Sequence, residues 1–157
     1  MHIRPFRTED AAILEQIFHR AVQATAREDY SQDQLNAWSP VSAGPERYLN
    51  RITRGGHQVW VAVTDTDTPI GFIELQADGH IDCFYRDPDH RSARVGEALY
   101  EALEAEARTT GLERLYVEAS EAAKRFFLRH DFTTLERNEF ERAGVMMHNT
   151  RLEKHLR

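Results

Sequence analysis

The sequence has little of several features that mark particular classes of protein. Its single cysteine, Cys83, cannot form a disulfide within the chain, so a reducing, cytoplasmic location is expected. No apolar run is long enough to cross a bilayer, and the amino terminus has no apolar segment of signal-peptide length, so no membrane partner is expected. The 20 basic residues are outnumbered by 26 acidic ones, and the formal charge of −6 argues against nucleic-acid binding, which needs a basic field.

Several motifs of catalytic and binding sites are also missing. There is no Gly-x-x-x-x-Gly-Lys phosphate loop, no Gly-x-Gly-x-x-Gly turn and no Gly-x-Ser-x-Gly elbow. The eight histidines show no metal-ligand spacing, so no metal is expected. Cys83 stands between apolar neighbours, which is more typical of a buried structural thiol than of a nucleophile.

What is present is the pattern of an ordinary globular domain. A chain of 157 residues can bury a core, and no repeat, low-complexity segment or linker divides it, so we expect one domain over residues 1–157. Apolar spacing predicts helices over 9–26, 31–38, 46–53, 95–110 and 121–129, with a loop over 40–45. Period-two patterns predict strands over 2–6, 58–63, 70–75, 80–85, 114–119, 132–139 and 145–152. This order predicts an α/β (α+β) fold, with helices on both faces of a mixed sheet.

The segment from His80 to Leu99 carries the most information about function. A strand leads through a proline-containing turn into a loop that opens onto the amino terminus of the clearest helix. The first turn of a helix has unpaired N–H groups and a positive dipole end, so an anion such as phosphate is stabilised there. The loop combines small residues with arginines: Arg91, Ser92, Ala93, Arg94 and Gly96. From these residues alone, an ordinary strand-to-helix connection with solvent-facing arginines remains an equal alternative.

This segment resembles the signature of the GNAT superfamily of acyl-CoA N-acyltransferases, Arg/Gln-x-x-Gly-x-Gly/Ala after a strand and a turn. Arg91, Val95 and Gly96 match it, and Asp87-Pro88-Asp89 precedes them. The later segment from Ser120 to Phe132 is similar to the family's second motif. A narrower resemblance, to the YafP-type bacterial N-acetyltransferases, rests on residues such as Tyr30, Trp38 and Asp82. The resemblance implies a sheet of about seven largely antiparallel strands with a central parallel pair.

The resemblance also implies an activity, the transfer of an acetyl group from acetyl-CoA to an amine. The acceptor would be a small-molecule amine or a peptide amine, and a homodimer is left open. The loop N–H groups would hold the CoA pyrophosphate, and the backbone around Phe84 to Arg86 would hold the thioester carbonyl. The implied cofactor-binding residues are Phe84, Tyr85, Arg86, Arg91, Ser92, Ala93, Arg94, Val95, Gly96, Glu97, Ser120 and Phe127.

Three residues depart from the family pattern. Arg94 stands where the signature has its first glycine, and it could crowd the phosphate or pair with it. Phe127 stands where many members have a tyrosine that protonates the leaving thiolate, and Asp131 replaces a common glycine. Because of Arg94 and Phe127, a non-catalytic acyl-CoA-binding domain remains an alternative.

The catalytic base and the acceptor pocket are predicted from position. His80 falls where many relatives have a carboxylate base, and strand alternation places Asp82 and Phe84 on its face, so either His80 or Asp82 could take the amine's proton. A solvated histidine and a structural aspartate are the alternative. Tyr30 and Trp38 could line the acceptor pocket or simply pack, and Glu74 and Glu118 could bind the amine through water or face outward.

Overall fold

The structure is a computed structural model that describes residues 1–39, 46, 49–50, 52–53, 56–90 and 93–156. The predicted loop over 40–45 lies outside these residues, as do three residues, 47, 48 and 51, of the predicted helix over 46–53. The elements in chain order are β1 (His2–Pro5), α1 (Ala11–Thr25), α2 (Gln32–Trp38), β2 (Gln58–Val63), β3 (Pro69–Leu75), β4 (Ile81–Arg86), α4 (Ala93–Thr109), β5 (Arg114–Ala119), α5 (Glu121–Arg129), β6 (Thr133–Arg142) and β7 (Val145–His155). None of the helices in the described ranges has both the length and the apolarity that a membrane span requires.

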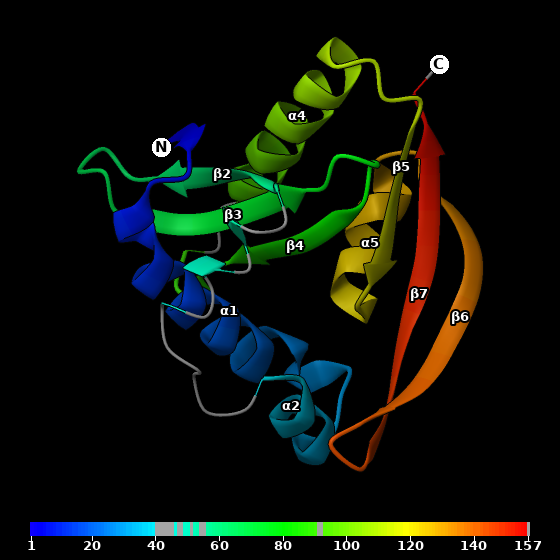
Figure 1. Ribbon diagram of the computed structural model, residues 1–157. Coiled ribbons are helices and arrows are strands. Elements are labelled where there is room, and N and C mark those ends of the chain that lie inside the picture. Colours follow the sequence, from blue (N-terminus) through cyan, green and yellow to red (C-terminus); the bar gives the residue numbers. More distant parts are fainter. Residues whose placement is uncertain (40–45, 47–48, 51, 54–55, 91–92, 157) are drawn as a thin grey trace.

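The strands form two antiparallel sheets, in the orders β1-β2-β3-β4 and β5-β7-β6. The sheets meet at the start of β4 and β5, where His80 and Tyr116 form a parallel bridge, and the two strands then diverge (Figure 1). The predicted fold class of seven largely antiparallel strands is therefore confirmed. The central parallel pair is confined to this bridge, and the divergence beyond it leaves a fork between the two sheets.

Helices cover both faces of the first sheet, as predicted. Helix α1 packs on β3 and β4 from one side, and α4 packs on β1, β2 and β3 from the other (Figure 1). The apolar stripe of α4 provides Val95, Leu99 and Leu103, each at most 1% exposed. Burial of each such side chain is worth about 1.5–3 kcal/mol, so α4 is firmly anchored on the sheet.

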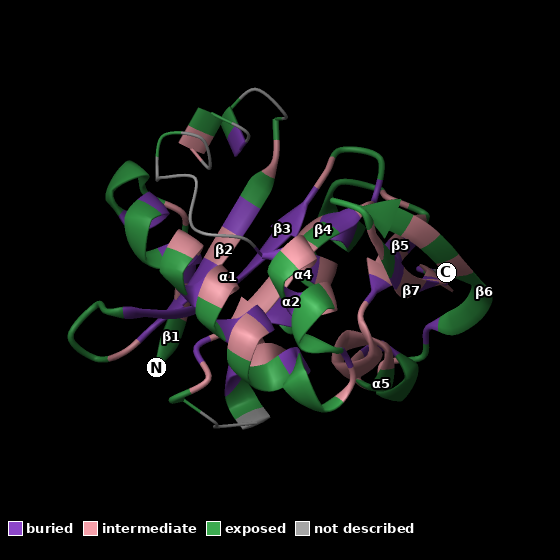
Figure 2. Cartoon of the chain, turned by 90° about the horizontal axis from the view of Figure 1, so that it is seen from below, coloured by how far each residue is buried: buried purple, intermediate pink, exposed green. Residues whose placement is uncertain are grey.

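The second sheet carries the shorter helices. Helix α5 packs on β5 and β7, and α2 packs on β7. The view from below in Figure 2 shows α1 and α2 with exposed outer faces and buried residues toward the strands. Ser31 accepts a hydrogen bond from the Gln34 N–H, and the Gln34 side chain accepts one from the Ser31 N–H. This capping box begins α2 and confirms the sequence signature.

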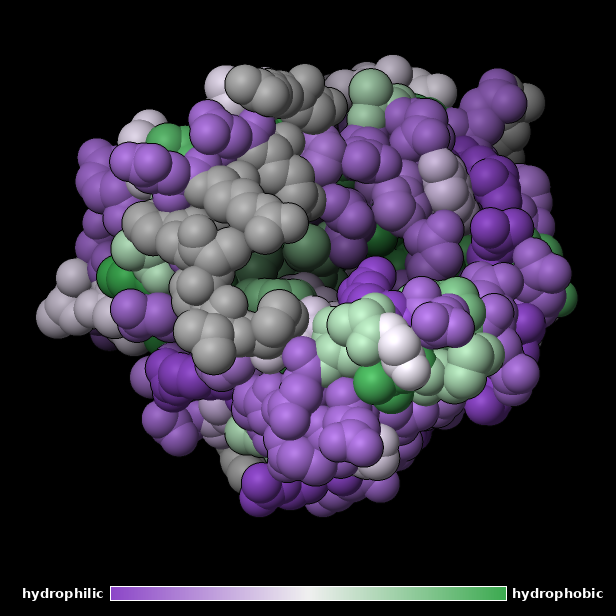
Figure 3. Space-filling model, turned by 60° about the horizontal axis from the view of Figure 1, so that its bottom comes forward, coloured by the Kyte–Doolittle hydropathy of each residue, from purple (hydrophilic) through white to green (hydrophobic). Residues whose placement is uncertain are grey.

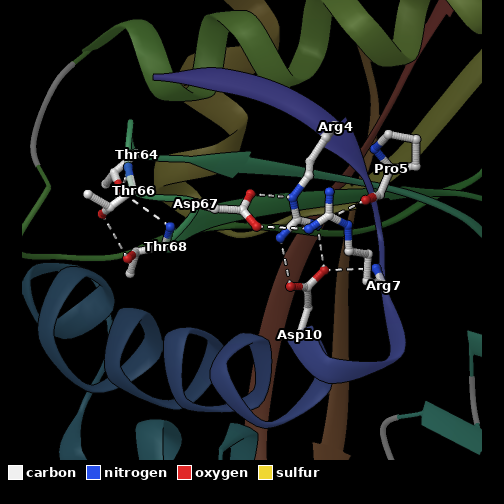
Figure 4. Close-up of polar contacts among 8 residues, drawn as sticks. All are labelled: Arg4, Pro5, Arg7, Asp10, Thr64, Thr66, Asp67 and Thr68. Carbon is white, nitrogen blue, oxygen red and sulfur yellow. Dashed lines mark hydrogen bonds and ion pairs between the residues drawn. The ribbon is translucent and has the colours of Figure 1, made fainter.

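A buried ion pair ties β1 to the start of α1 and to the β2–β3 turn. The Arg4 guanidinium donates to both Asp10 oxygens, at 2.8 and 2.9 Å, and its Nε donates to Asp67 at 2.8 Å (Figure 4). The side chains of Arg4 and Asp10 are only 9% and 6% exposed. The hydrogen bond to Asp10 is the main cause that raises the pKa of Arg4 above its usual range. Such a pair holds the first strand in place, because either charge left alone there would be costly.

Candidate active site

The fork depends on a glycine at the start of β4. Gly79 has φ +98°, and a Cβ added to it would lie 2.2 Å from the carbonyl oxygen of Arg114. Its N–H closes a turn on the carbonyl of Gln76 at 3.0 Å, and its own carbonyl accepts from the Tyr116 N–H at 3.0 Å. Only glycine combines this backbone conformation with so close an approach, so Gly79 joins the two sheets at the base of the fork.

A β-bulge in β4 decides which side chains face the fork. Ile73 pairs with Phe84, whereas Leu75 pairs with Ile81, so three steps along β4 match two along β3. An extra residue reverses the alternation of side chains beyond it. As a result, Phe84 packs on Phe126 and Phe127 of α5, on the same side as Ile81. The expectation that strict alternation places Phe84 on the face of His80 and Asp82 is therefore wrong.

Two adjoining cavities, each of about 280 Å³, lie at the fork: one between β4 and β5, and the other between β4 and helices α1, α4 and α5. Both are lined by Trp38, Phe84, Tyr85, Ser120 and Ala123, which form the wall between them. The view in Figure 3 shows a hollow with hydrophobic residues at its floor, hydrophilic residues at its upper right border and a hydrophobic group below it. A ligand could therefore reach from one cavity to the other past this shared wall.

The first cavity lies between α1 and the amino-terminal ends of α4 and α5. Among the residues predicted to bind the cofactor, it is lined by Phe84, Tyr85, Arg86, Gly96, Glu97 and Ser120. A Cβ on Gly96 would lie 3.4 Å from ring atoms of both Phe84 and Phe126, so a larger side chain would have to enter the cavity. The first turn of α4 is thus open to a ligand at Gly96.

The other predicted cofactor residues lie in different places. Val95 is 1% exposed and belongs to the core, and Arg94 is exposed on the first turn of α4. Arg91 and Ser92 lie outside the described residues. Ala93 begins α4, and the structure describes its backbone but not its side chain. Phe127 is fully buried in the aromatic cluster of α5 and lines the second cavity instead.

The second cavity gathers the predicted catalytic and acceptor residues except Glu74, which lines neither cavity. His80, Asp82, Glu118, Tyr30 and Trp38 all line it. Sequence reasoning missed the wall that β6 and β7 contribute: Phe140, Arg142, Met147, His148 and Asn149. These residues belong to no local motif, because they reach the cavity only through pairing of the last two strands.

Tyr30 connects α2, α5 and β7 around this cavity. Its hydroxyl donates to the His148 carbonyl at 3.3 Å and accepts from the Glu121 N–H at 3.2 Å. Its ring stacks on the His148 ring at 4.7 Å between centroids, and burial raises the pKa of the phenol. Ser120 begins α5 and accepts from the Ala123 N–H at 3.3 Å, which is an ordinary N-cap. The side of the second cavity that Tyr30, Ser120 and His148 line is therefore held in place by specific hydrogen bonds.

His80 is paired with Glu118 across the fork. His80 Nε2 and Glu118 Oε2 are 2.5 Å apart, and the other ring nitrogen, Nδ1, lies 2.7 Å from Gln76 Oε1. Tyr116 stacks on the His80 ring at 4.9 Å. A short contact between an imidazole nitrogen and a carboxylate oxygen requires a shared proton, so the pair is able to accept and donate protons at the cavity.

Glu74 is buried rather than outward-facing. Its side chain is 0% exposed, and its Oε1 lies 3.2 Å from Nδ1 of His57, a residue that sequence reasoning missed. Asp82 Oδ2 lies 3.9 Å from the same nitrogen. The alternative of an outward-facing Glu74 is therefore wrong, because β3 is buried along its whole length.

His57, Glu74 and Asp82 could also be considered as cation ligands. One ligand atom from each lies within 4.8 Å of the others. They come from three segments that only the sheet register brings together, so sequence spacing could not have revealed the group. The 3.2 Å separation of His57 Nδ1 and Glu74 Oε1 is that of a hydrogen bond, and we assign no metal to these residues. The expectation that no metal is needed stays a prediction.

The chain matches the family described as Acetyltransferase (GNAT) domain over residues 26–154. It is 33% identical over 150 residues to the uncharacterized N-acetyltransferase YafP of Escherichia coli (strain K12), covering 95% of this chain and 92% of YafP. It is 35% identical over 86 residues to the peptidyl-lysine N-acetyltransferase YjaB of Salmonella typhimurium (strain LT2), covering 55% of this chain and 57% of YjaB. A solved GCN5-related N-acetyltransferase from Rhodopseudomonas palustris has a TM-score of 0.89 and 32% identity, covering 98% of this chain and 94% of that one.

The chain therefore belongs to the GNAT acetyltransferase family. The resemblance inferred from the signature around Gly96 and from the second motif is confirmed, including its similarity to YafP. The protein is an acetyltransferase, and the fork between β4 and β5 is its candidate active site.

Proposed function

We propose that the protein transfers the acetyl group of acetyl-CoA to an amine by direct attack inside the fork, with residues 1–157 acting as one domain. The observation that carries this proposal is the pair of cavities that adjoin at the end of β4. One opens at Gly96, on the first turn of α4, and the other holds the His80–Glu118 pair. A two-substrate reaction needs such an arrangement, because both reactants must meet at one point.

The first cavity suits the cofactor. Pyrophosphate would lie at the amino terminus of α4, where N–H groups and the helix dipole stabilise negative charge. Val95 is buried, so it would contribute its N–H rather than its side chain. The pantetheine arm would pass Gly96 toward Phe84, and the thioester would reach the wall shared by the two cavities.

The second cavity suits a cationic amine, because the carboxylates of Asp82 and Glu118 both line it. The ammonium gives a proton to the hydrogen-bonded His80–Glu118 pair through the Glu118 carboxylate that lines the cavity, and the freed electron pair attacks the thioester carbonyl carbon. Backbone N–H groups between Phe84 and Arg86 stabilise the developing oxyanion. The C–S bond then breaks, and the CoA thiolate takes a proton from water, because the buried Phe127 has none to give.

YjaB is named a peptidyl-lysine acetyltransferase, and a lysine side chain is one amine that fits these charges. The whole-chain similarity to YafP leaves the acceptor open, so peptides, polyamines, aminoglycosides and amino acids are all candidates. A cytoplasmic location, proposed from the single cysteine, would give the protein access to acetyl-CoA.

The test is a thiol-release screen with acetyl-CoA over those four classes of amine. We expect steady CoA release with at least one class. Gly96→Glu should abolish release and weaken acetyl-CoA binding at least 10-fold, because a carboxylate would enter the phosphate end of the cavity. Ala105→Glu is the matched control, since it adds the same charge on an exposed position of the same helix. Binding of acetyl-CoA without release for any amine would instead favour a non-catalytic binding domain.

A further inference from the structure

Two histidines line the second cavity, and their ring nitrogens differ in what they contact. Both nitrogens of His80 are engaged, Nδ1 with Gln76 at 2.7 Å and Nε2 with Glu118 at 2.5 Å. Neither ring nitrogen of His148 has a hydrogen-bond partner in the part of the chain that the structure describes. His148 is therefore the histidine of this cavity with a ring nitrogen left for a ligand.

The two nitrogens of His148 have different surroundings. Nδ1 is the one buried side-chain nitrogen or oxygen among the described residues that lacks a hydrogen bond, and Oε1 of Glu121 lies 3.5 Å from it. Nε2 lacks a hydrogen bond as well, so it cannot be one of the buried atoms. Because the side chain lines the second cavity, Nε2 is the nitrogen that a ligand there can reach.

The Glu121 carboxylate decides which nitrogen carries the proton of the neutral ring. A lone pair on Nδ1 would be repelled by the carboxylate oxygen 3.5 Å away, whereas an N–H is attracted to it, and burial strengthens both effects. The neutral ring therefore holds its proton on Nδ1, and Nε2 offers a lone pair to the cavity. That lone pair can accept a hydrogen bond from an N–H of a bound amine.

Tyr30 holds the ring of His148 without occupying its nitrogens. The two rings stack at 4.7 Å between centroids. The Tyr30 hydroxyl is used by the His148 carbonyl and the Glu121 N–H, so one tyrosine fixes both members of the pair. Glu139 is the cross-strand partner of His148, and its carboxylate is paired with Arg137 at 3.4 Å. Glu121 is thus the charged group that faces the ring nitrogens.

His148 also lies close to the wall that the two cavities share. It faces Glu121, and Ser120, the preceding residue, is part of that wall. The proposed function brings the thioester of acetyl-CoA to the same wall. An amine held at Nε2 would therefore be placed beside the carbon that it attacks, and such placement lowers the barrier to reaction.

We propose that His148 is an acceptor-binding residue, whose Nε2 accepts one N–H of the amine while Glu121 keeps the ring proton on Nδ1. This inference rests on the proposed function, in which the second cavity holds the amine. The His80–Glu118 pair removes one proton of the ammonium, and His148 holds another N–H, so that the freed lone pair is directed at the thioester. No proton moves to or from His148 in this role.

The direct test uses protein labelled with ¹⁵N-histidine and the probe n-butylamine, a primary amine with no other polar group. At a pH where the ring is neutral, long-range ¹⁵N–¹H spectra should show the Nδ1–H form of His148 in the wild type and more of the Nε2–H form in Glu121→Leu. Adding n-butylamine in the presence of CoA should shift the Nε2 resonance of His148. The signals of His155, which is on the same strand and 69% exposed, should stay in place. An Nε2–H form in the wild type, or an Nε2 resonance that n-butylamine leaves unmoved, overturns the inference.

Kinetics supply a second readout. His148→Phe keeps a ring that can stack on Tyr30 but removes both nitrogens. It should raise KM for the amine about 10- to 100-fold, as expected when one hydrogen bond from a charged group is lost, and leave the affinity for acetyl-CoA unchanged. His148→Gln should recover much of the loss, because its side-chain oxygen can accept in place of Nε2.

His155→Phe is the matched control, the same substitution at an exposed position of the same strand, and it should leave KM unchanged. An unchanged KM for the amine in His148→Phe contradicts the binding role. A shift of the Nε2 resonance without thiol release from any amine would contradict the proposed function and leave the binding role intact.

Discussion

Gly79→Ala is expected to loosen the junction of the two sheets. The new methyl group would lie 2.2 Å from the Arg114 carbonyl oxygen, far inside contact distance, at a backbone φ of +98°. The unfavourable backbone conformation costs about 1–3 kcal/mol, and relief of the overlap costs about 1–3 kcal/mol more. The expected loss of 2 to 6 kcal/mol is large for a domain whose stability is about 5–15 kcal/mol.

The matched control is Gly111→Ala. Gly111 also has a positive φ, +82°, but nothing lies within 4 Å of an added Cβ. It should lose only the conformational part, about 1–2 kcal/mol. Urea unfolding of both variants measures the difference, and thiol release should fall only in Gly79→Ala, because moving β4 from β5 separates His80 from Glu118. Equal losses of stability in the two variants would refute the steric argument.

Two further predictions concern buried and exposed charges. Arg4→Ala should lower the free energy of unfolding by about 3–5 kcal/mol, because it leaves the Asp10 carboxylate buried without its partner. Adding Asp10→Asn should recover part of this loss, as measured by chemical denaturation. If the losses of the two single variants simply add in the double variant, the pairing is contradicted. The hydrogen bond between Tyr116 and Asp78 lowers the pKa of Asp78 and raises the pKa of Tyr116 to about 12. Its stabilisation is therefore present between the ordinary pKa values of about 3.9 and 10, and is lost as pH falls through the lowered pKa of Asp78 or rises toward 12. Tyr116→Phe should cost less than about 1 kcal/mol near neutrality and nothing at either extreme, and a cost that does not vary with pH would exclude this bond as the cause.

Elements with strong local signals could be predicted from the sequence. The strands at 58–63 and 114–119 and the helix at 121–129 have the predicted bounds, and the Ser31–Gln34 capping box begins α2 as expected. Each depends on side-chain periodicity or on contacts between residues three apart. Such interactions are determined by a short stretch of sequence and do not depend on the rest of the chain.

Features set by strand pairing could not be predicted in the same way. The bulge in β4 arises from its register with β3, and it places Phe84 on the opposite face from the one that simple alternation indicates. His57 contacts Glu74 and Gln76 because β2 and β3 are paired, and no sequence motif joins these positions. The family signature located the cavity at Gly96, while the hydrogen-bonded surroundings of His80 needed the three-dimensional arrangement.

The measurement that tests the central claim most directly is the pH dependence of amine acetylation in His80→Ala, with Asp82→Asn as the comparison. Loss of a general base costs about 100- to 10,000-fold, so kcat/KM in His80→Ala should fall by that factor near pH 7 and recover partly at high pH, where free amine is abundant. Asp82→Asn should keep most of its activity, because Asp82 faces His57 rather than the shared proton of His80 and Glu118. Wild-type rates in His80→Ala across the whole pH range would contradict the account and place the base elsewhere.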